Sequence, residues 1–110
     1  IKDSIIAISS AKYASVISGT NTNIIATDSI INATSNTAVI FSVNKGDVKA
    51  RKNSFKVTGQ IGRIFELFNV KGEILDNDFK SDLTNKNNSV AIYTDNKCLL
   101  EIKENEDYGF

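Results

Sequence analysis

Apolar and polar residues alternate along this chain in short runs that are bounded by turn-forming residues. After Gly46, for example, apolar and basic side chains alternate over Val48, Lys49, Ala50 and Arg51. Successive side chains of a strand point to opposite faces, so this alternation predicts strands that bury one face. No apolar run approaches the ~18 residues of a membrane-spanning helix, and we expect no membrane span.

The alternating run returns along the chain as part of a longer repeat. Each copy begins with a small or turn residue and ends with an asparagine followed by an aromatic residue, over Gly46–Phe55, Gly72–Phe79 and Cys98–Tyr108. The first residues of these copies are numbered 46, 72 and 98, a spacing of 26. A fainter copy covers Thr22–Ile30. Self-similarity at a period of about 20–50 residues indicates a repeat architecture.

Alignment of the glycines brings the flanking residues of the copies into register. Val39 then matches Phe65, and Phe41 matches Leu67. A two-residue deletion in the middle copy brings the closing aromatics together. The alignment predicts four columns of stacked residues: Gly46, Gly72 and Cys98; Val48, Ile74 and Leu100 in the core; Asn53, Asn77 and Asn105 at a turn; and Phe55, Phe79 and Tyr108.

A unit of this size cannot bury its apolar face alone and must stack on its neighbours. Propeller blades need longer repeats of four strands, so a solenoid is favoured. We predict an all-β parallel solenoid of about four coils, one segment over residues 1–110 with its register clearest over 38–110. Further upstream the spacing points Val16, Ile24, Ala26 and Ile30 inward and places Asp28 or Asn32 at the turn, while residues 1–13 fit the repeat least.

The composition agrees with a strand-rich fold and excludes several partners. Ile, Asn, Ser and Thr are abundant, and Pro, His, Trp and Met are absent. Thirteen basic and thirteen acidic residues cancel, so no global field attracts nucleic acid or an anionic membrane. Because the chain has no Met, we expect a processed product or a part of something longer, with the rest of a longer β-helix or another chain at its open coil ends.

The repeat of Gly, alternating apolar residues and Asn-x-aromatic resembles the right-handed parallel β-helix repeat of pectate-lyase-like proteins. The resemblance is carried by Gly46–Phe55, Gly72–Phe79 and, less closely, Cys98–Tyr108 with Asn105. It implies right-handed coils, and in that family it is specific for architecture rather than for activity.

Enzymes of the family cleave acidic polysaccharides, and the resemblance allows three kinds of site to be compared with this chain. Galacturonan hydrolases carry a Gly-His-Gly element, but this chain has no His. Calcium-dependent pectate lyases carry a Pro-containing Arg motif, and this chain has no Pro. Chondroitin- and alginate-cleaving lyases use a Lys and an Arg, a scheme that Lys71, Lys80 and Arg63 could be fitted to without any motif that compels it.

Other catalytic chemistry finds little support in the sequence. Without His there is no Ser-His or Cys-His nucleophile pair and no ordinary zinc site. We expect no cofactor and at most weak calcium binding by Asp76 and Asp78 with Asp82, a solvated turn being the simpler interpretation. For Cys98, the only cysteine, we expect a small buried thiol.

Positive charge gathers in the middle of the chain. Residues 45–63 hold six basic side chains and one acidic one, whereas residues 81–110 hold three basic and six acidic. A basic outer face could pair with carboxylates or sulfates of an acidic glycan, or simply solvate a strand face. The candidate glycan-binding residues are Lys49, Arg51, Arg63 and Lys71.

Two classes of function remain. The first is an extracellular or cell-surface scaffold or binding segment, similar to an adhesin, an autotransporter passenger or a fibre, which contacts glycans. The second is part of a polysaccharide lyase that acts on alginate, pectate or chondroitin. Lateral loops of solenoids often carry binding functions, and here they are Gly19–Asn23, Thr58–Gly62 and Thr84–Ser89.

Overall fold

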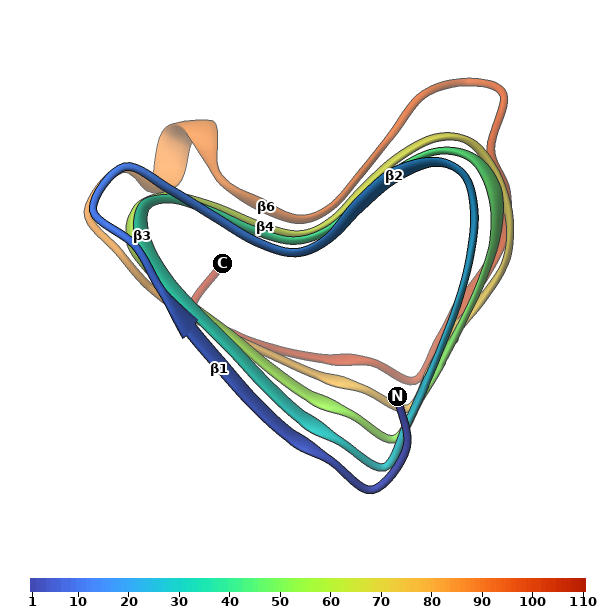
Figure 1. The fold of residues 1–110 in the computed structure, drawn as a ribbon, viewed down its shortest axis with the longest axis horizontal. Coiled ribbons are helices and arrows are strands. Elements are labelled where there is room, and N and C mark those ends of the chain that lie inside the picture. Colours follow the sequence, from blue (N-terminus) through green and yellow to red (C-terminus); the bar gives the residue numbers. More distant parts are fainter.

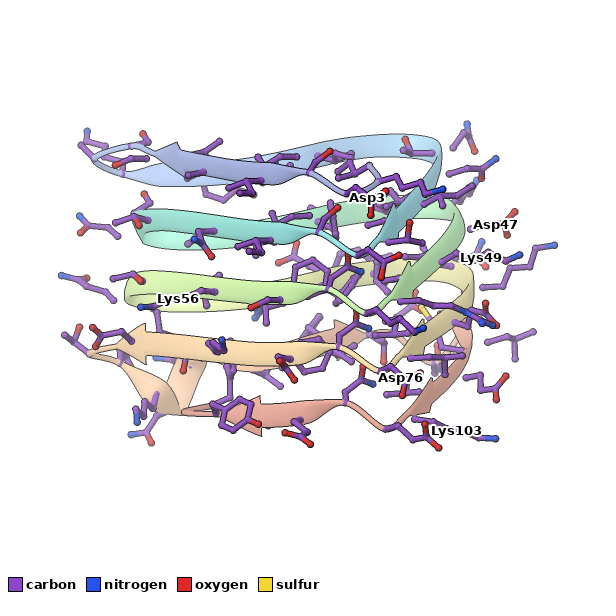
Figure 2. All side chains as sticks on the ribbon, turned by 90° about the horizontal axis from the view of Figure 1, so that it is seen from below. Asp3, Asp47, Lys49, Lys56, Asp76 and Lys103 are labelled. Atoms are coloured by element: carbon purple, nitrogen blue, oxygen red, sulfur yellow. The ribbon has the colours of Figure 1, made fainter.

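The computed structural model describes all 110 residues, which form a parallel β-solenoid of about four turns. Viewed along the solenoid axis from its N-terminal end, the chain turns clockwise as it recedes, so the coils are right-handed (Figure 1). The coils stack directly on one another (Figure 2). The predicted all-β solenoid is thereby confirmed.

The strands bend around the corners of the coils, and the two longest each cover almost a whole turn. In chain order they are β1 (Ile5–Ser9), β2 (Tyr13–Thr27), β3 (Ile30–Arg51), β4 (Ser54–Leu75), β5 (Asp78–Leu83), β6 (Val90–Thr94), β7 (Leu99–Lys103) and β8 (Glu106–Tyr108). One short 3-10 turn, η1 (Lys86–Asn88), interrupts the fourth coil. No helix here has the length and apolar character needed to cross a membrane.

Each coil has three sides, so the solenoid has three faces. Strands β5, β6 and β7 each pair with a different part of β4, and we name each face after one of them. The β5 face stacks β1, β3, β4, β5 and β8, all in parallel. The β6 face stacks β2, β3, β4 and β6, and the β7 face stacks the later parts of β2, β3 and β4 with β7. A residue's place along its coil therefore decides which face it occupies.

The middle coils repeat every 24 residues, not every 26, and β1 lies 25 residues before its partner positions in β3. Phe41 lies opposite Phe65, and Asn53 hydrogen-bonds to Asn77 in the next coil. The fourth coil is longer, because Lys71 lies opposite Leu99, 28 residues on. Part of the added length lies in the predicted longer loop 84–89, which holds η1 and stands outside the outline of the other coils in Figure 1.

The predicted glycine column was wrong by two residues. Gly46 lies opposite Val70, whereas Gly72 lies between Val48 and Leu100. Each of the two glycines instead stands where the neighbouring backbone leaves no room for a side chain. Gly72 has a φ of 141°, and a Cβ on it would lie 1.8 Å from the Val48 carbonyl oxygen. Gly46 has a φ of 150°, and a Cβ on it would lie 1.8 Å from the carbonyl oxygen of Thr22. Glycine is required where the backbone of the preceding coil comes this close.

The same two-residue error affected the residues aligned through the glycines. Val39 lies opposite Arg63, not Phe65, and Phe41 lies opposite Phe65, not Leu67. Val48 and Ile74 are both buried, as predicted, but in different columns, because Ile74 lies opposite Ala50. Leu100 is half-buried and packs against the core, and Cys98 contacts Val70 rather than Gly72.

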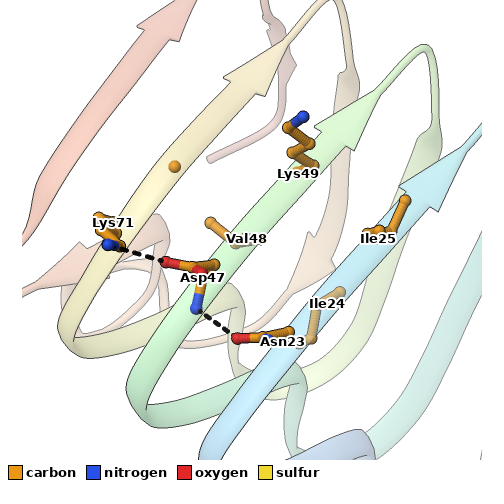
Figure 3. Close-up of a pocket in the computed structure, with 8 residues that line it drawn as sticks. Asn23, Ile24, Ile25, Asp47, Val48, Lys49 and Lys71 are labelled. Atoms are coloured by element: carbon orange, nitrogen blue, oxygen red, sulfur yellow. Dashed lines mark hydrogen bonds and ion pairs between the residues drawn. The ribbon is translucent and has the colours of Figure 1, made fainter.

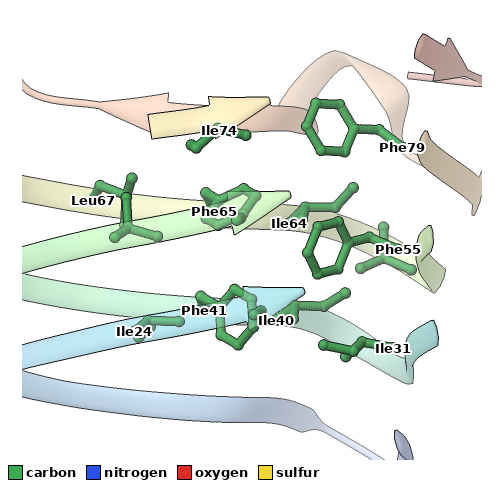
Figure 4. Close-up of a cluster of buried hydrophobic side chains, with 14 of the residues drawn as sticks. Ile24, Ile31, Ile40, Phe41, Phe55, Ile64, Phe65, Leu67, Ile74 and Phe79 are labelled. Carbon is green, nitrogen blue, oxygen red and sulfur yellow. The ribbon is translucent and has the colours of Figure 1, made fainter. Parts of the chain in front are cut away.

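Aromatic rings fill the centre of the coils (Figure 4). Phe55 lies opposite Phe79 as predicted, with ring centroids 6.2 Å apart, and no deletion is needed to align them. Phe41 and Phe65 complete the cluster, and their rings lie 5.8 and 5.4 Å from that of Phe55. Tyr108 was wrongly placed in this column, since it lies opposite Lys80 and its exposed hydroxyl donates to Glu106.

The N-terminal coil is more regular than the sequence indicated. β1 pairs in register with β3, so residues 1–13 do belong to the solenoid. Ile24 and Ala26 are buried as predicted, and Asp28 forms the turn with a left-handed φ of 52°. Ile30 was wrongly assigned to the core, because it is exposed while its neighbour Ile31 is buried.

The predicted asparagine column is confirmed. Asn53 and Asn77 are buried at the corner before the β5 face, and Asn105 is half-buried there. The side-chain amide of Asn53 donates to the Ala26 carbonyl at 2.8 Å, and those of Asn77 and Asn105 donate to equivalent carbonyls one coil later each. These amides satisfy backbone groups that the corner would otherwise leave unpaired in the core.

Candidate functional site

Outward side chains on the β7 face form two columns that run parallel to the solenoid axis (Figure 3). One column holds Asn23, Asp47 and Lys71, and the other holds Ile25, Lys49 and Glu73. The strand residues between the two columns leave mainly backbone at the surface. The result is an open groove of about 460 Å³, lined by residues of three successive coils.

Positive charge in this groove comes from Lys49 and Lys71. The Lys71 ammonium lies 4.0 Å from a carboxylate oxygen of Asp47, and both side chains are more than half exposed. An ion pair this exposed is weak in water and gives way easily to another anion. Lys49 makes no salt bridge at all. Both ammonium groups are therefore available to an anionic ligand.

A second hollow of about 390 Å³ continues the groove on the other side of Lys71 and brings in Lys97. We call the two hollows together, with Lys49, Lys71 and Lys97, the lysine groove. Sequence reasoning missed Lys97, because it lies in the acidic C-terminal part of the chain. Its distance of 26 residues from Lys71, close to one long coil, was a signal that could have found it.

The turn that carries Lys97 is held by the carboxylate of Asp95. This carboxylate accepts the backbone N–H groups of Asn69 at 3.1 Å and Lys97 at 3.0 Å. These bonds, led by the one from Asn69, lower the pKa of Asp95, with help from the Cys98 thiol at 3.3 Å. Cys98 is half-buried against the core and is the free thiol of this turn.

Arg51 lies on the same face as Lys49, as predicted, but its charge is already matched. Its guanidinium forms two contacts with one carboxylate oxygen of Glu73, at 2.7 and 2.9 Å. Because Glu73 follows Arg51 by almost a whole coil, this pair joins adjacent coils. Arg51 thus stabilises the stack and contributes little free charge to the groove.

Arg63 lies on the β6 face, apart from the lysine groove. Its guanidinium donates to Glu66 at 2.9 Å and lies 4.0 Å above the ring of Tyr93. Ser42 donates a further, longer hydrogen bond to Glu66. The structure therefore brings Lys49 and Lys71 together and leaves Arg63 in a separate cluster.

The residues considered for a lyase do not meet. Arg63 lies on the β6 face, Lys71 on the β7 face and Lys80 on the β5 face. The carboxylates considered for calcium, Asp76, Asp78 and Asp82, do not form a group, and no cluster of three or more metal-ligating side chains occurs.

Asp76 instead contacts Glu104 of the following coil. A hydrogen bond between these two carboxyl groups, together with their charge repulsion, raises the pKa of Glu104. Both residues belong to a column with left-handed φ angles, which stands on the outside of the asparagine corner.

Comparison of this chain with protein-family models, with curated proteins and with solved structures gave no match in any of the three. An account of its function therefore depends on the geometry of the lysine groove.

Proposed function

We propose that this chain is a rigid β-solenoid scaffold that binds an acidic polysaccharide along the lysine groove. The observation that carries the proposal is the alignment of Lys49, Lys71 and Lys97 along one groove, where the exposed pair with Asp47 is the only salt bridge that the three lysines make. Ammonium groups pair with the carboxylate or sulfate groups of such polymers.

The shape of the groove favours a polymer over a small anion. The groove runs across coils, which repeat at about 4.8 Å, and it is open rather than enclosed. A chain with anionic groups at regular intervals can contact cations on several coils at once. Ile25 is 61% exposed beside the groove and offers an apolar surface to the C–H face of a sugar ring.

We further propose that the segment acts at the cell surface or outside the cell, as part of an adhesin-like, passenger-like or fibre-like structure. The likeness of its repeat to the pectate-lyase-like β-helix supports a relation to that superfamily. Acidic polysaccharides are extracellular polymers, so a scaffold that binds them would act there. The alternative of a polysaccharide lyase has no observation in its favour, since its candidate residues lie on three faces.

Binding of alginate, polygalacturonate and chondroitin sulfate, measured by isothermal titration calorimetry in a salt series, tests this proposal. We expect at least one polymer to bind, with affinity that falls as salt rises. The triple variant Lys49→Ala, Lys71→Ala, Lys97→Ala should lower affinity at least tenfold. The matched control is Lys12→Ala, Lys56→Ala, Lys80→Ala, which also removes three exposed lysines, all of them outside the groove.

Two results would contradict the proposal. One is the absence of binding to all three polymers at low salt, and the other is an equal loss of affinity in the control variant. The same samples should be followed by ultraviolet absorbance for unsaturated sugars. Product that forms with the native chain and disappears in Lys71→Ala would replace the scaffold with a lyase.

A further inference from the structure

The three lysines of the lysine groove stand on a regular oblique row. Asp47, two residues before Lys49, lies opposite Lys71 in the next coil. Leu99, two residues after Lys97, lies opposite Lys71 in the coil after that. Each step along the row therefore advances by one coil and moves back by two residues. For Lys49 and Lys71, which both lie in strands, the strand and coil spacings make this step about 8 Å between Cα atoms.

Acidic residues occupy the other diagonal between Lys49 and Lys71. Asp47 shares the strand of Lys49 and lies opposite Lys71, whereas Glu73 shares the strand of Lys71 and lies opposite Lys49. The carboxylate of Glu73 is held by Arg51 at 2.7 Å, and its side chain is only 19% exposed. The side chain of Asp47 is 51% exposed, and of these two acidic residues it is Asp47 that lines the groove (Figure 3).

Asp47 stands where the two hollows of the groove meet, because Asp47 and Lys71 are the two residues that line both. A polymer that occupies both hollows must pass this pair. Lys71 is the only salt-bridge partner of Asp47. When the Lys71 ammonium turns to an anionic group of the polymer, the Asp47 carboxylate is left without a cation.

The exposed carboxylate of Asp47 then decides which group of the polymer fits between the lysines. An ionised carboxylate only accepts hydrogen bonds, so Asp47 needs a donor from the polymer. A hydroxyl or an amide N–H supplies one, and the charge of Asp47 strengthens that bond. A second carboxylate at the same place would be repelled. The row therefore favours anionic groups at the lysines and an uncharged donor between them.

The length of the step agrees with this alternation. A step of about 8 Å exceeds the advance of one sugar in an extended polysaccharide and approaches that of a disaccharide. The flexible side chains of the lysines cover the remaining difference. Consecutive lysines of the row thus meet every second sugar of a bound chain, and the sugar between them faces Asp47.

Building on the proposed function, we propose that the lysine groove selects polysaccharides in which an acidic sugar alternates with an uncharged sugar that carries a hydroxyl or amide donor. Asp47 is the residue that sets this selectivity. The acidic groups pair with the lysines of the row, and the donor of the intervening sugar binds the Asp47 carboxylate. A polymer with a carboxylate on every sugar binds less tightly, because one carboxylate comes to lie beside Asp47.

Isothermal titration calorimetry at low salt with two kinds of oligosaccharide tests the selectivity. Hyaluronan oligosaccharides alternate glucuronate with N-acetylglucosamine, whereas oligogalacturonates carry a carboxylate on every sugar. The two are matched in their number of carboxylates, so that total charge does not decide the result. We expect the native chain to bind hyaluronan about fivefold more tightly, the effect of one repulsion between exposed charges in water.

Asp47→Asn removes the charge and keeps an oxygen acceptor. It should raise affinity for the oligogalacturonate about fivefold and change affinity for hyaluronan by less than about twofold. The matched control is Asp82→Asn, which removes an exposed carboxylate of β5 outside the groove and should change neither affinity.

Equal affinities of the native chain for the two oligosaccharides, or an equal gain for both in Asp47→Asn, would overturn the selectivity and leave the polysaccharide scaffold in place. Absence of binding to both oligosaccharides would also overturn the selectivity. The titrations with alginate, polygalacturonate and chondroitin sulfate then decide separately whether the scaffold proposal stands.

Discussion

The side-chain oxygen of Asn77 accepts two hydrogen bonds from Asn53, one from its backbone N–H and one from its side-chain amide, both at 3.0 Å. Both residues are buried, so water cannot replace these bonds. Asn77 in turn donates to Asn105, and the amide bonds therefore form a continuous chain through the stack. Such a chain ties the position of each coil to that of the next.

Asn77→Ala should lower the free energy of unfolding by about 3 kcal/mol, because it leaves buried donors of Asn53 without an acceptor. Asn77→Ser is the matched control, since the chain itself uses Ser29 at the equivalent corner and its oxygen accepts the N–H of Ser4. The serine variant should lose only about half as much. Urea unfolding followed by circular dichroism measures both, and equal losses would contradict a role for the shared acceptor.

Gly72→Ala should be far more damaging than Gly19→Ala. The backbone φ of 141° disfavours an L residue, and the new Cβ would overlap the Val48 carbonyl oxygen. We expect a loss of about 3 kcal/mol or more in the free energy of unfolding. Gly19→Ala is the control, because its Cβ meets only the side chain of Thr22, which can rotate. Similar melting temperatures for the two variants would contradict this account.

The spacing of Asn53 and Asn77 and that of Phe55 and Phe79 were visible in the sequence, and both give the 24-residue length of the middle coils. Asparagine recurs because its side chain must hydrogen-bond to the asparagine of the next coil. Phenylalanine recurs because its ring must pack on the phenylalanine of the next coil. Glycine has no such partner. Gly46 and Gly72 each stand where a carbonyl of the preceding coil comes too close for a side chain, and these two places lie two residues apart along the coil.

The candidate site was less accessible to sequence reasoning. Alternation correctly put Lys49 and Arg51 on one outer face, but it could not show that Glu73 neutralises Arg51 from the next coil. Nor could it assign Arg63 to another face, because the positions of the corners depend on how the coils stack. Charge counts along the chain likewise hid Lys97, which lines the groove although it belongs to the acidic C-terminal part of the sequence.

Substitution of two neighbouring residues tests the corrected register of the N-terminal corner. Ile31 is fully buried in the core, whereas its neighbour Ile30 is 45% exposed. Ile31→Ala should therefore lower the free energy of unfolding by about 2–5 kcal/mol, and Ile30→Ala by less than about 1 kcal/mol. Thermal and urea unfolding of the two variants give the comparison. A larger loss for Ile30→Ala would restore the inward position that the spacing predicted for Ile30.

The carboxylate of Asp95 gives the turn before β7 a predictable response to acid. The Asn69 N–H, with the Cys98 thiol and the Lys97 N–H, lowers its pKa below the ordinary value of 3.8. Because the folded protein favours the ionised form, the stabilisation is fully present above the pKa of the unfolded chain. It is lost as the pH falls through the lower pKa of the folded state.

Carbon-13 NMR titration of the aspartate carboxyl groups should therefore find Asp95 titrating below 3.8. The turn at the end of the lysine groove should change its conformation over the same pH range. This change should appear as shifts in the amide signals of Asn69 and Lys97. Asp95→Asn keeps an oxygen acceptor and removes the charge, so these shifts should disappear while the fold remains. An Asp95 pKa at or above 3.8, or amide shifts that persist in the variant, would show that this carboxylate does not hold the turn.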